Sequence, residues 1–484
     1  MGFLFSTEIN ASLHSAESLF EETAEIPQMI TRRKLIMKKV LAMVLALMMM
    51  AGAASAMAEG FTKPFDVPAT GEKFVIYAWN DEFLGMLKNY YIPAVGGTVA
   101  DDGTVTFPNG DVLEFVINPN DDGNYQAKLD AALSNGQHID MFLMEADYAL
   151  KYVNSEYTRP IESVGITAEE MASQYPYTLQ VATDENGVVK GSSWQAAPGL
   201  FMYRASLAEK YLGVKTPEEM QEKVKDWDSW LATAREVNEK SEGATKLIPS
   251  NGDVWQVVRT VRQSPWVDED LNLVIDDQVK WYFDFAKTLR QENLTANANP
   301  WTEGWNACMG NDSVMGLFFS TWGIQWTMVG NSNGTAPGEG TYGDWRACKG
   351  PQPYYWGGTW LAVCSTCTND ALAADIIRFF TTEEDSMKVY CLGSKDYVNN
   401  DAAVKSIIDD GFSFDFLGGQ DHYSLFREVL PLIDVSTMSA YDQNINSAMD
   451  TQVNFYATGE KDLDTALADF AAAVVDLYPE ITAD

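Results

Sequence analysis

Short apolar runs alternate with amphipathic stretches along most of the chain after residue 60. Lys73–Trp79, Val112–Ile117 and Ile139–Met144 are rich in β-branched or aromatic residues, and each predicts a buried strand. Between the last two, Asn124–Leu133 has apolar residues at helical spacing, which predicts a helix. Strands that alternate with helices favour a parallel sheet. The pattern therefore predicts an α/β unit in this part of the chain.

The middle and the end of the chain are richer in helical patterns. Thr216–Glu219 forms a capping box with proline at the first helical position, which marks a helix start, and Asp226–Lys240 predicts a long amphipathic helix. Further strands are predicted at Val314–Ser320 and Thr359–Cys364, and further helices at Asn369–Phe380, Ala440–Tyr456 and Leu463–Leu477. No flexible linker follows residue 60, so two domains would be joined by several crossing segments, which suits a hinge.

The first 60 residues follow a different pattern. Lys38 and Lys39 precede an apolar run from Val40 to Met50, and small residues with Ala-x-Ala endings follow as far as Ala58. This order of charged, apolar and small residues is typical of a secretory signal peptide. The apolar run is too short for a permanent membrane-spanning helix.

We therefore expect residues 37–58 to be a signal peptide that is cleaved near Ala58. We expect residues 1–36 to be a non-native upstream extension, with the true start at Met37. No cysteine lies near the predicted cleavage site, so no residue there could carry a lipid anchor. The mature protein would be exported, and would be extracellular, on the cell surface or periplasmic.

Composition excludes several classes of function. Asp and Glu number 69 against 33 Lys and Arg, and the resulting net charge of −36 repels phosphate backbones, so we expect no nucleic-acid partner. The chain has only three His, which leaves little material for imidazole metal sites. Cys364 and Cys367 have redox spacing but no second pair, and the calcium-loop-like run from Asn118 has Leu129 at its twelfth position. We expect no metal and no cofactor.

Several segments, taken together in their order and spacing, resemble the extracellular solute-binding proteins of ABC transporters, of the large carbohydrate-binding type (family 1). The resemblance covers residues 72–475. The segments that carry it are Tyr77–Glu82, Tyr125–Leu129, Asp140–Met144, Gly199–Arg204 and Gly357–Ala362.

This resemblance implies an α/β, two-lobed periplasmic-binding-protein-like fold with hinge crossovers and a ligand cleft between the lobes. We expect residues 59–190 and 313–350 to form the N-terminal lobe, and 191–312 and 351–484 to form a helix-rich C-terminal lobe. The resemblance also implies a carbohydrate ligand, ABC transporter permease subunits as membrane partners, and no enzymatic activity. We expect a monomer.

The tryptophans provide the first candidate site residues. All fourteen lie between Trp79 and Trp360. A flat indole can stack on the apolar face of a pyranose ring, while polar side chains bind its hydroxyl groups. Most tryptophans are expected to pack in the interior. Four stand at predicted strand ends or turns beside Asn, Gln, Ser or Gly, and we expect these to bind ligand: Trp79, Trp194, Trp322 and Trp356.

Polar residues at the same places complete the predicted site. Carboxylates accept hydroxyl groups in bidentate fashion, and ligands of open α/β sheets bind at the carboxyl ends of strands. Glycine lets the backbone approach a ligand closely. The polar and glycine candidates are Asn80, Asp81 and Glu82 after the first strand, Glu145 after the third, Gln195 and Tyr203 near the crossover, and Gly357 and Gly358.

Two other functions remain open on the sequence. Aromatic residues with acidic partners also suit a polyamine or another small cation on the same fold. A secreted glycoside hydrolase would use a pair of carboxylates, and the acidic residues are numerous enough to supply one. Of these two alternatives the hydrolase ranks last, because no acidic pair is singled out by its spacing.

Overall fold

The computed structural model describes residues 61–483, except for the side chain of residue 122. The predicted upstream extension and signal peptide, residues 1–36 and 37–58, lie outside the described residues. Within the described range, no helix combines the length and the apolar character needed to cross a membrane.

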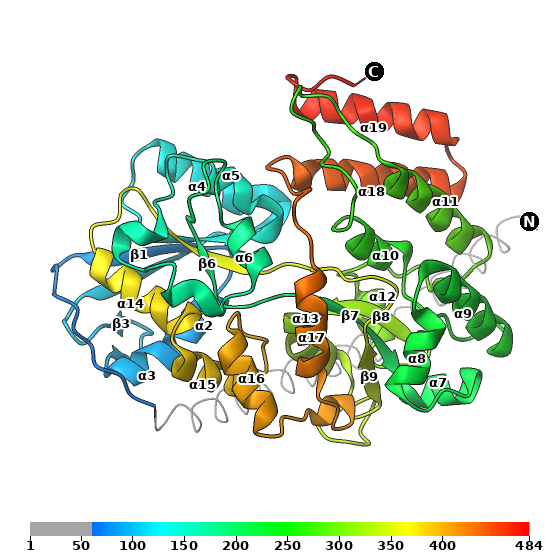
Figure 1. Cartoon of the computed structure of the whole chain (residues 1–484), viewed down its shortest axis with the longest axis horizontal. Coiled ribbons are helices and arrows are strands. Elements are labelled where there is room, and N and C mark those ends of the chain that lie inside the picture. The colour runs from blue at the N-terminus through cyan, green and yellow to red at the C-terminus, as the bar shows by residue number, and fades with distance from the viewer. Residues whose placement is uncertain (1–60, 484) are drawn as a thin grey trace, which may run out of the picture. The chain divides into compact units, whose positions relative to one another are not determined.

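Seven strands form the first sheet, in the order β2-β3-β4-β1-β5-β10-β6 (Figure 1). The three predicted strands at its centre are confirmed, and β1 pairs in parallel with both β4 and β5. β10 instead runs antiparallel to β5 and β6. The bounds are β1 Lys73–Ala78, β2 Thr98–Val99, β3 Val105–Thr106, β4 Val112–Ile117, β5 Met141–Glu145, β6 Ser192–Ser193 and β10 Thr359–Val363.

Three antiparallel strands form the second sheet, in the order β8-β7-β9. Their bounds are Gly199–Arg204 for β7, Gly316–Ser320 for β8 and Trp345–Cys348 for β9. Every residue of β7 and β8 is buried, which explains why β8 appears in the sequence as an unbroken apolar run. We call each sheet with its packed helices a lobe, the first lobe and the second lobe.

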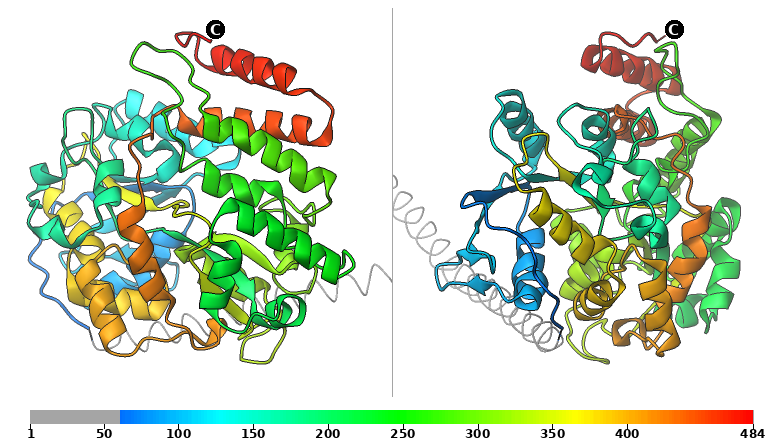
Figure 2. Two further views of the ribbon diagram at one scale, coloured as in Figure 1. Left: turned by 45° about the vertical axis from the view of Figure 1, so that its right-hand side comes forward. Right: turned by 60° about the vertical axis from the view of Figure 1, so that its left-hand side comes forward.

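Helices cover both sheets (Figures 1 and 2). Those of the first lobe include α2 Glu82–Met86, η1 Leu87–Tyr91, α3 Ile92–Val95, α4 Asn124–Ser134, η3 Ala146–Tyr148, α5 Ala149–Val153, α6 Pro176–Val181, α14 Asp370–Thr381, α15 Glu384–Ser394, α16 Asp401–Asp409 and α17 His422–Val429. Those of the second lobe include α7 Ala205–Leu212, α8 Pro217–Val224, α9 Trp227–Lys240, α10 Asn251–Val258, α11 Asp277–Gln291, α12 Glu303–Cys308, α13 Thr321–Gly323, η6 Ile324–Val329, α18 Asp442–Thr458 and α19 Leu463–Leu477.

Local sequence signals account for several of these helices. The predicted helix start is confirmed, because the Thr216 side chain accepts a hydrogen bond from the backbone N–H of Glu219 at the start of α8. The Glu219 carboxylate accepts from the backbone N–H of Lys215 at 2.7 Å in place of that of Thr216, so only half of the predicted capping box forms. Asp226 caps α9 in the same way, through Ser229. α11, α18 and α19 lie side by side, and α19 closes the described chain against α18.

Strand pairing divides the chain differently from the predicted lobes. Residues 313–350 were expected in the N-terminal lobe, but β8 and β9 pair with β7 in the second lobe. Residues 351–484 were expected in the C-terminal lobe, but β10 pairs with β5 and α14 packs against β6, both in the first lobe. An apolar run predicts a buried strand without naming its partner, so the sequence pattern could not assign these segments.

Three segments connect the lobes. They are residues 194–198 between β6 and β7, 349–358 between β9 and β10, and 433–441 between η8 (Leu430–Leu432) and α18. The first is tied to the end of β8, because Ser320 Oγ donates to the carbonyl of Ala197 at 3.1 Å and Thr321 Oγ1 donates to Ala196 at 3.0 Å. Multiple parallel connections of this kind allow hinge motion about a defined axis.

Candidate functional site

Three tryptophans form a cluster at the end of β8. Trp322 Nε1 donates to the carbonyl of Trp356 at 2.8 Å, and the two ring centroids are 5.9 Å apart at 80°. Trp301 lies parallel to Trp322, with centroids 6.0 Å apart and 11° between the planes. Phe319 packs behind both Trp322 and Trp356. We call Trp301, Trp322 and Trp356 the tryptophan cluster.

Two glycines carry the second connection past this cluster. Gly357 and Gly358 have φ values of 74° and 115°, which L side chains rarely adopt. A Cβ on Gly357 would lie 3.2 Å from Trp322 Nε1 and 3.7 Å from Glu145 Oε1. The chain therefore passes between an indole of the second lobe and a carboxyl group of the first, and only glycine fits comfortably at that point.

Glu145 brings a carboxyl group to this place from the last residue of β5. Its Oε2 accepts a hydrogen bond from the backbone N–H of Asp147 at 2.9 Å. Burial, together with the negative charge of Asp147, raises the pKa of Glu145 to about 8. At neutral pH the protonated form is favoured, so the group can both donate and accept hydrogen bonds.

Asp147 is engaged by the opposite lobe. Arg259, the residue that ends α10, donates from Nη1 to Asp147 Oδ1 at 2.7 Å. The Arg259 side chain is 7% exposed, so this ion pair is largely shielded from water. The contact connects the loop after β5 in the first lobe with a helix of the second lobe.

Trp79 directly follows β1, the strand that pairs with β5. It is half-buried, and its ring meets Tyr125 and Tyr148 edge to face at 5.5 Å and 6.3 Å. Tyr148 is 2% exposed, and its hydroxyl has no hydrogen-bond partner among the described residues. Burial raises the pKa of Tyr148, and the neighbouring Tyr125 and then Glu145 add to the effect.

The structure thus brings together five of the predicted residues. Trp322, Trp356, Gly357, Gly358 and Glu145 lie in one group, and Trp79 adjoins it through Tyr148.

Three predicted residues are not part of this group, and their side chains are buried elsewhere in this structure. Trp194 is completely buried and stacks on Phe83 at 5.3 Å. Gln195 is buried and donates to Asp396 at 2.9 Å. Tyr203 is 2% exposed within β7. A position next to a strand end does not say whether the side chain turns outward or into the lobe.

Asn80, Asp81 and Glu82 lie at the start of α2. Asn80 Oδ1 accepts from the backbone N–H of Glu82 at 3.1 Å, while Asp81 is exposed. Burial raises the pKa of Glu82 to about 7, with Asp81 adding to the effect. Glu82 in turn raises the pKa of the buried Asp396, which reaches about 8 mainly through burial. No contact described above joins these three residues to the tryptophan cluster, and their role in binding stays a prediction.

Three residues of the site were missed on the sequence. Trp301 lies in the loop between α11 and α12, directly after Pro300. A tryptophan in a loop is a sequence signal that could have marked this residue as a candidate for ligand binding. Arg259 carried no comparable signal, because its place depends on how the two lobes meet. Tyr148 carried none either, because its contacts with Trp79 and Tyr125 join segments that are distant in the sequence.

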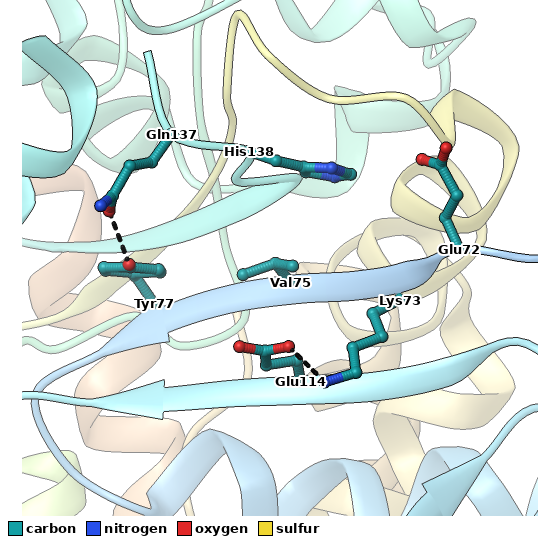
Figure 3. Close-up of a pocket in the computed structure, with 7 residues that line it drawn as sticks. All are labelled: Glu72, Lys73, Val75, Tyr77, Glu114, Gln137 and His138. Carbon is teal, nitrogen blue, oxygen red and sulfur yellow. Dashed lines mark hydrogen bonds and ion pairs between the residues drawn. The ribbon is translucent and has the colours of Figure 1, made fainter. Parts of the chain in front are cut away.

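An open hollow of about 600 Å³ lies elsewhere, on the face of the first sheet (Figure 3). Four of the residues that line it are already paired with one another, since Lys73 pairs with Glu114 at 2.8 Å, and Tyr77 donates to Gln137 at 3.3 Å. None of the predicted site residues lines it.

Among the described residues, no group of three or more His, Cys, Asp or Glu could hold a metal ion. The tryptophan cluster with Glu145 is therefore the better candidate site.

Comparisons with known proteins agree with this arrangement of lobes. A family model described as bacterial extracellular solute-binding protein matches residues 109–401. A comparison with curated proteins returned no match. The chain belongs to the bacterial extracellular solute-binding proteins.

Solved structures share the fold at low sequence identity. One family 1 extracellular solute-binding protein is 16% identical, with a TM-score of 0.69, covering 84% of this chain and 99% of its own. The galacto-N-biose-/lacto-N-biose I-binding protein of Bifidobacterium longum, in complex with lacto-N-biose, is 13% identical with a TM-score of 0.65, covering 87% and 100%. A binding protein of B. animalis subsp. lactis, in complex with β-1,6-galactobiose, is 18% identical with a TM-score of 0.61, covering 85% and 99%. The two-lobed fold predicted from the sequence is confirmed.

Proposed function

We propose that this protein is the substrate-binding component of an ABC importer and captures a carbohydrate by hinged closure. The observation that carries the proposal is the tryptophan cluster of the second lobe, placed across Gly357 from the Glu145 carboxyl group of the first. Indole faces and a carboxyl group together match the apolar face and the hydroxyl rim of a sugar ring. Structurally similar proteins hold lacto-N-biose and β-1,6-galactobiose, which supports a sugar as cargo.

Closure follows from the same arrangement. A ligand that contacts both lobes favours the conformation in which both sets of contacts are made, and it can shift the equilibrium only by that difference in affinity. The transporter permease then distinguishes loaded from empty protein by the position of the lobes. In this account the ligand is bound and released without chemical change, and the protein acts as a monomer.

The proposed binding residues are Trp79, Glu145, Trp322, Trp356, Gly357 and Gly358. Asn80, Asp81 and Glu82 belong to the proposal as the adjoining start of α2. The proposal also includes export: the chain would be exported through a signal peptide that is cleaved near Ala58, and it would carry no lipid anchor.

A cationic cargo such as a polyamine is the second candidate, favoured by the acidic groups beside aromatic rings. The contacts argue against it. Asp147 is already paired with Arg259, and burial raises the pKa of Glu145 to about 8, so these two carboxyl groups beside the tryptophan cluster offer little negative charge to a cation.

Thermal unfolding with a panel of neutral oligosaccharides and polyamines tests the proposal. A ligand at about 100 times its Kd stabilises the folded state by about 2.7 kcal/mol, which is readily measured. We expect at least one oligosaccharide to raise Tm and to quench tryptophan fluorescence, with little dependence on salt. Stabilisation by a polyamine alone, declining steeply with ionic strength, would favour the second candidate.

A further inference from the structure

Arg262 is a buried arginine that lies three residues after Arg259, and its side chain is 1% exposed. Its Nη2 donates to Asp442 Oδ2 at 2.8 Å, and its guanidinium group lies 4.8 Å from the centroid of the Trp266 ring. Asp442 is the first residue of α18 and is also buried. Two charges that lose their water contribute little net stability even when they pair, so stability alone does not explain this ion pair.

The same guanidinium group also holds two backbone carbonyl groups. Arg262 Nη1 donates to the carbonyl of Arg259 at 2.9 Å, and Nη2 donates to the carbonyl of Thr437 at 3.0 Å. The first carbonyl belongs to the residue that ends α10, where the helix itself offers no donor. The second lies in the third connection, residues 433–441. The planar fork of an arginine suits this double contact, whereas a lysine ammonium group is a single point charge on a flexible stem.

The third connection is thereby anchored at its second-lobe end. The Oγ and the backbone N–H of Ser439 both donate to Asp442 Oδ1, at 2.7 and 3.2 Å. Together with the Arg262–Thr437 bond, these contacts fix the end of the connection to the second lobe. The hydrogen bonds of residues 433–436 are instead with near neighbours in the sequence. Bending between the lobes should therefore occur ahead of Thr437.

The second connection meets the same charges at Tyr355. Burial raises the pKa of Tyr355, and the negative charges of Asp442 and Asp147 add to the rise. The positive charges of Arg259 and Arg262 oppose it. All four charged groups therefore lie near one phenol. Two of the three connections, and the ion pair that joins the lobes, meet in one place.

We propose that Arg262 is a positioning residue, which joins the end of α10 to the second-lobe end of the third connection and so places Arg259 to meet Asp147 when the lobes close. The inference rests on the proposed function, since it concerns how the closing movement is directed. Without the Arg262 fork, the end of α10 and the third connection can move separately. Arg259 then keeps its charge but loses the support that aims it at Asp147.

Hydrogen exchange of the ligand-free protein, followed by mass spectrometry, measures this coupling without a sugar. Arg262→Lys keeps the positive charge beside Asp442 and removes the planar fork. Arg262→Met combined with Asp442→Asn removes both charges, so that no charge is left buried alone. Arg204→Lys is the matched control. Arg204 is a second-lobe arginine whose side chain is 7% exposed, and it holds the carbonyl of Asn311 and the carboxylate of Asp344, which lie outside the three connections.

We expect both Arg262 variants to exchange about tenfold faster in two segments, residues 433–441 of the third connection and residues 146–153 of the first lobe, because each segment loses support from a charged donor. The central strand β5 should exchange as slowly as in wild type. When Asp147→Asn is added, Arg262→Lys should no longer affect residues 146–153, although it should still affect residues 433–441. Arg204→Lys should affect neither segment.

Three results would overturn the inference. The first is unchanged exchange of residues 146–153 in both Arg262 variants, which would confine the role of Arg262 to the second lobe. The second is faster exchange everywhere, β5 included, which would mean a loss of global stability. The third is an effect of Arg262→Lys on residues 146–153 that persists without the Asp147 carboxylate. Sugar titrations decide the proposed function separately, so the two accounts can fail independently.

Discussion

Arg259 donates a hydrogen bond to the carboxylate of Asp147 at 2.7 Å, and the two residues belong to different lobes. Arg259 ends α10 and is further held by Gln256, whose Oε1 accepts from its Nε at 3.0 Å. Asp147 lies in η3, directly after the strand that ends in Glu145. The pair joins the two lobes in this structure, so we expect it to favour the arrangement in which they are in contact.

Replacing Asp147 by Asn keeps the shape of the side chain and removes its charge. Loss of one partner of a fully buried pair costs about 3–5 kcal/mol. When the lobes separate, water can solvate Arg259, so the free energy of closure should change by less than this, about 1–2 kcal/mol. That change corresponds to a loss of roughly 5- to 30-fold in ligand affinity. Small-angle scattering of the sugar-bound protein measures closure directly.

The Arg378–Glu170 pair offers a control, because it joins two elements of the first lobe. Glu170→Gln should change neither affinity nor compaction. Equal effects of the two substitutions on affinity and on compaction would mean that the Asp147 contact has no special part in closure.

Truncation of Trp322 tests the stacking surface. Trp322→Ala removes the central ring of the cluster, and buried tryptophans at binding sites contribute about 2 kcal/mol or more, roughly 30-fold in affinity. Calorimetric titration with the best oligosaccharide measures the loss. Trp281→Phe, in the aromatic packing of α11 with Trp227 and Phe285, should leave the affinity unchanged. A normal affinity for Trp322→Ala would remove this ring from the site.

Gly357→Ala separates backbone strain from crowding. The residue has a φ of 74°, and its Cβ would lie 3.2 Å from Trp322 Nε1. Gly187 has a similar φ of 78° but nothing within 4 Å of the added atom. We expect both Ala variants to lose about 1–2 kcal/mol of stability from the backbone term. Only Gly357→Ala should also weaken sugar binding, and an equal affinity in the two variants would contradict the assignment.

The stability of the protein should rise as the solution is acidified from pH 9 towards pH 6. Burial raises the pKa of Asp396 to about 8 and that of Asp253 to about 7. Between the unfolded pKa near 4 and these folded values, the folded protein holds protons that the unfolded chain releases. Stability is therefore lost with rising pH across that window, by about 1.4 kcal/mol per pH unit for each fully shifted group.

His422 sets the acid limit of this behaviour. Burial lowers its pKa to about 3, so below pH 6.5 the unfolded chain binds a proton that the folded protein does not. This loss offsets the gain from one buried carboxyl group down to about pH 4, the unfolded pKa of Asp, and stability therefore declines with further acidification only below that pH. Chemical denaturation at a series of pH values measures the profile. Asp396→Asn should flatten its alkaline side, while an unchanged slope would show that Asp396 does not titrate in this range.

How far the sequence predicts this molecule depends on whether the signal is local. β1, β4 and β5 follow from local runs of β-branched and aromatic residues, and the start of α8 follows from the cap at Thr216. The division into lobes does not follow, because β8 and β10 are apolar runs of similar appearance that pair in different sheets.

The same distinction applies to the site. Trp322 and Trp356 were predicted from their places at strand ends and turns, and they do lie together. Trp194 has the same local setting, yet it is buried against Phe83 because the chain turns inward there. Arg259 reaches Asp147 only through the meeting of two lobes, which no local pattern encodes.

Small-angle scattering of the exported protein, with and without an oligosaccharide that it binds, tests the central claim most directly. The account predicts a smaller radius of gyration in the presence of the sugar, and intact sugar recovered afterwards by chromatography. An unchanged radius at saturating sugar, or recovery of cleaved sugar, would contradict capture by hinged closure.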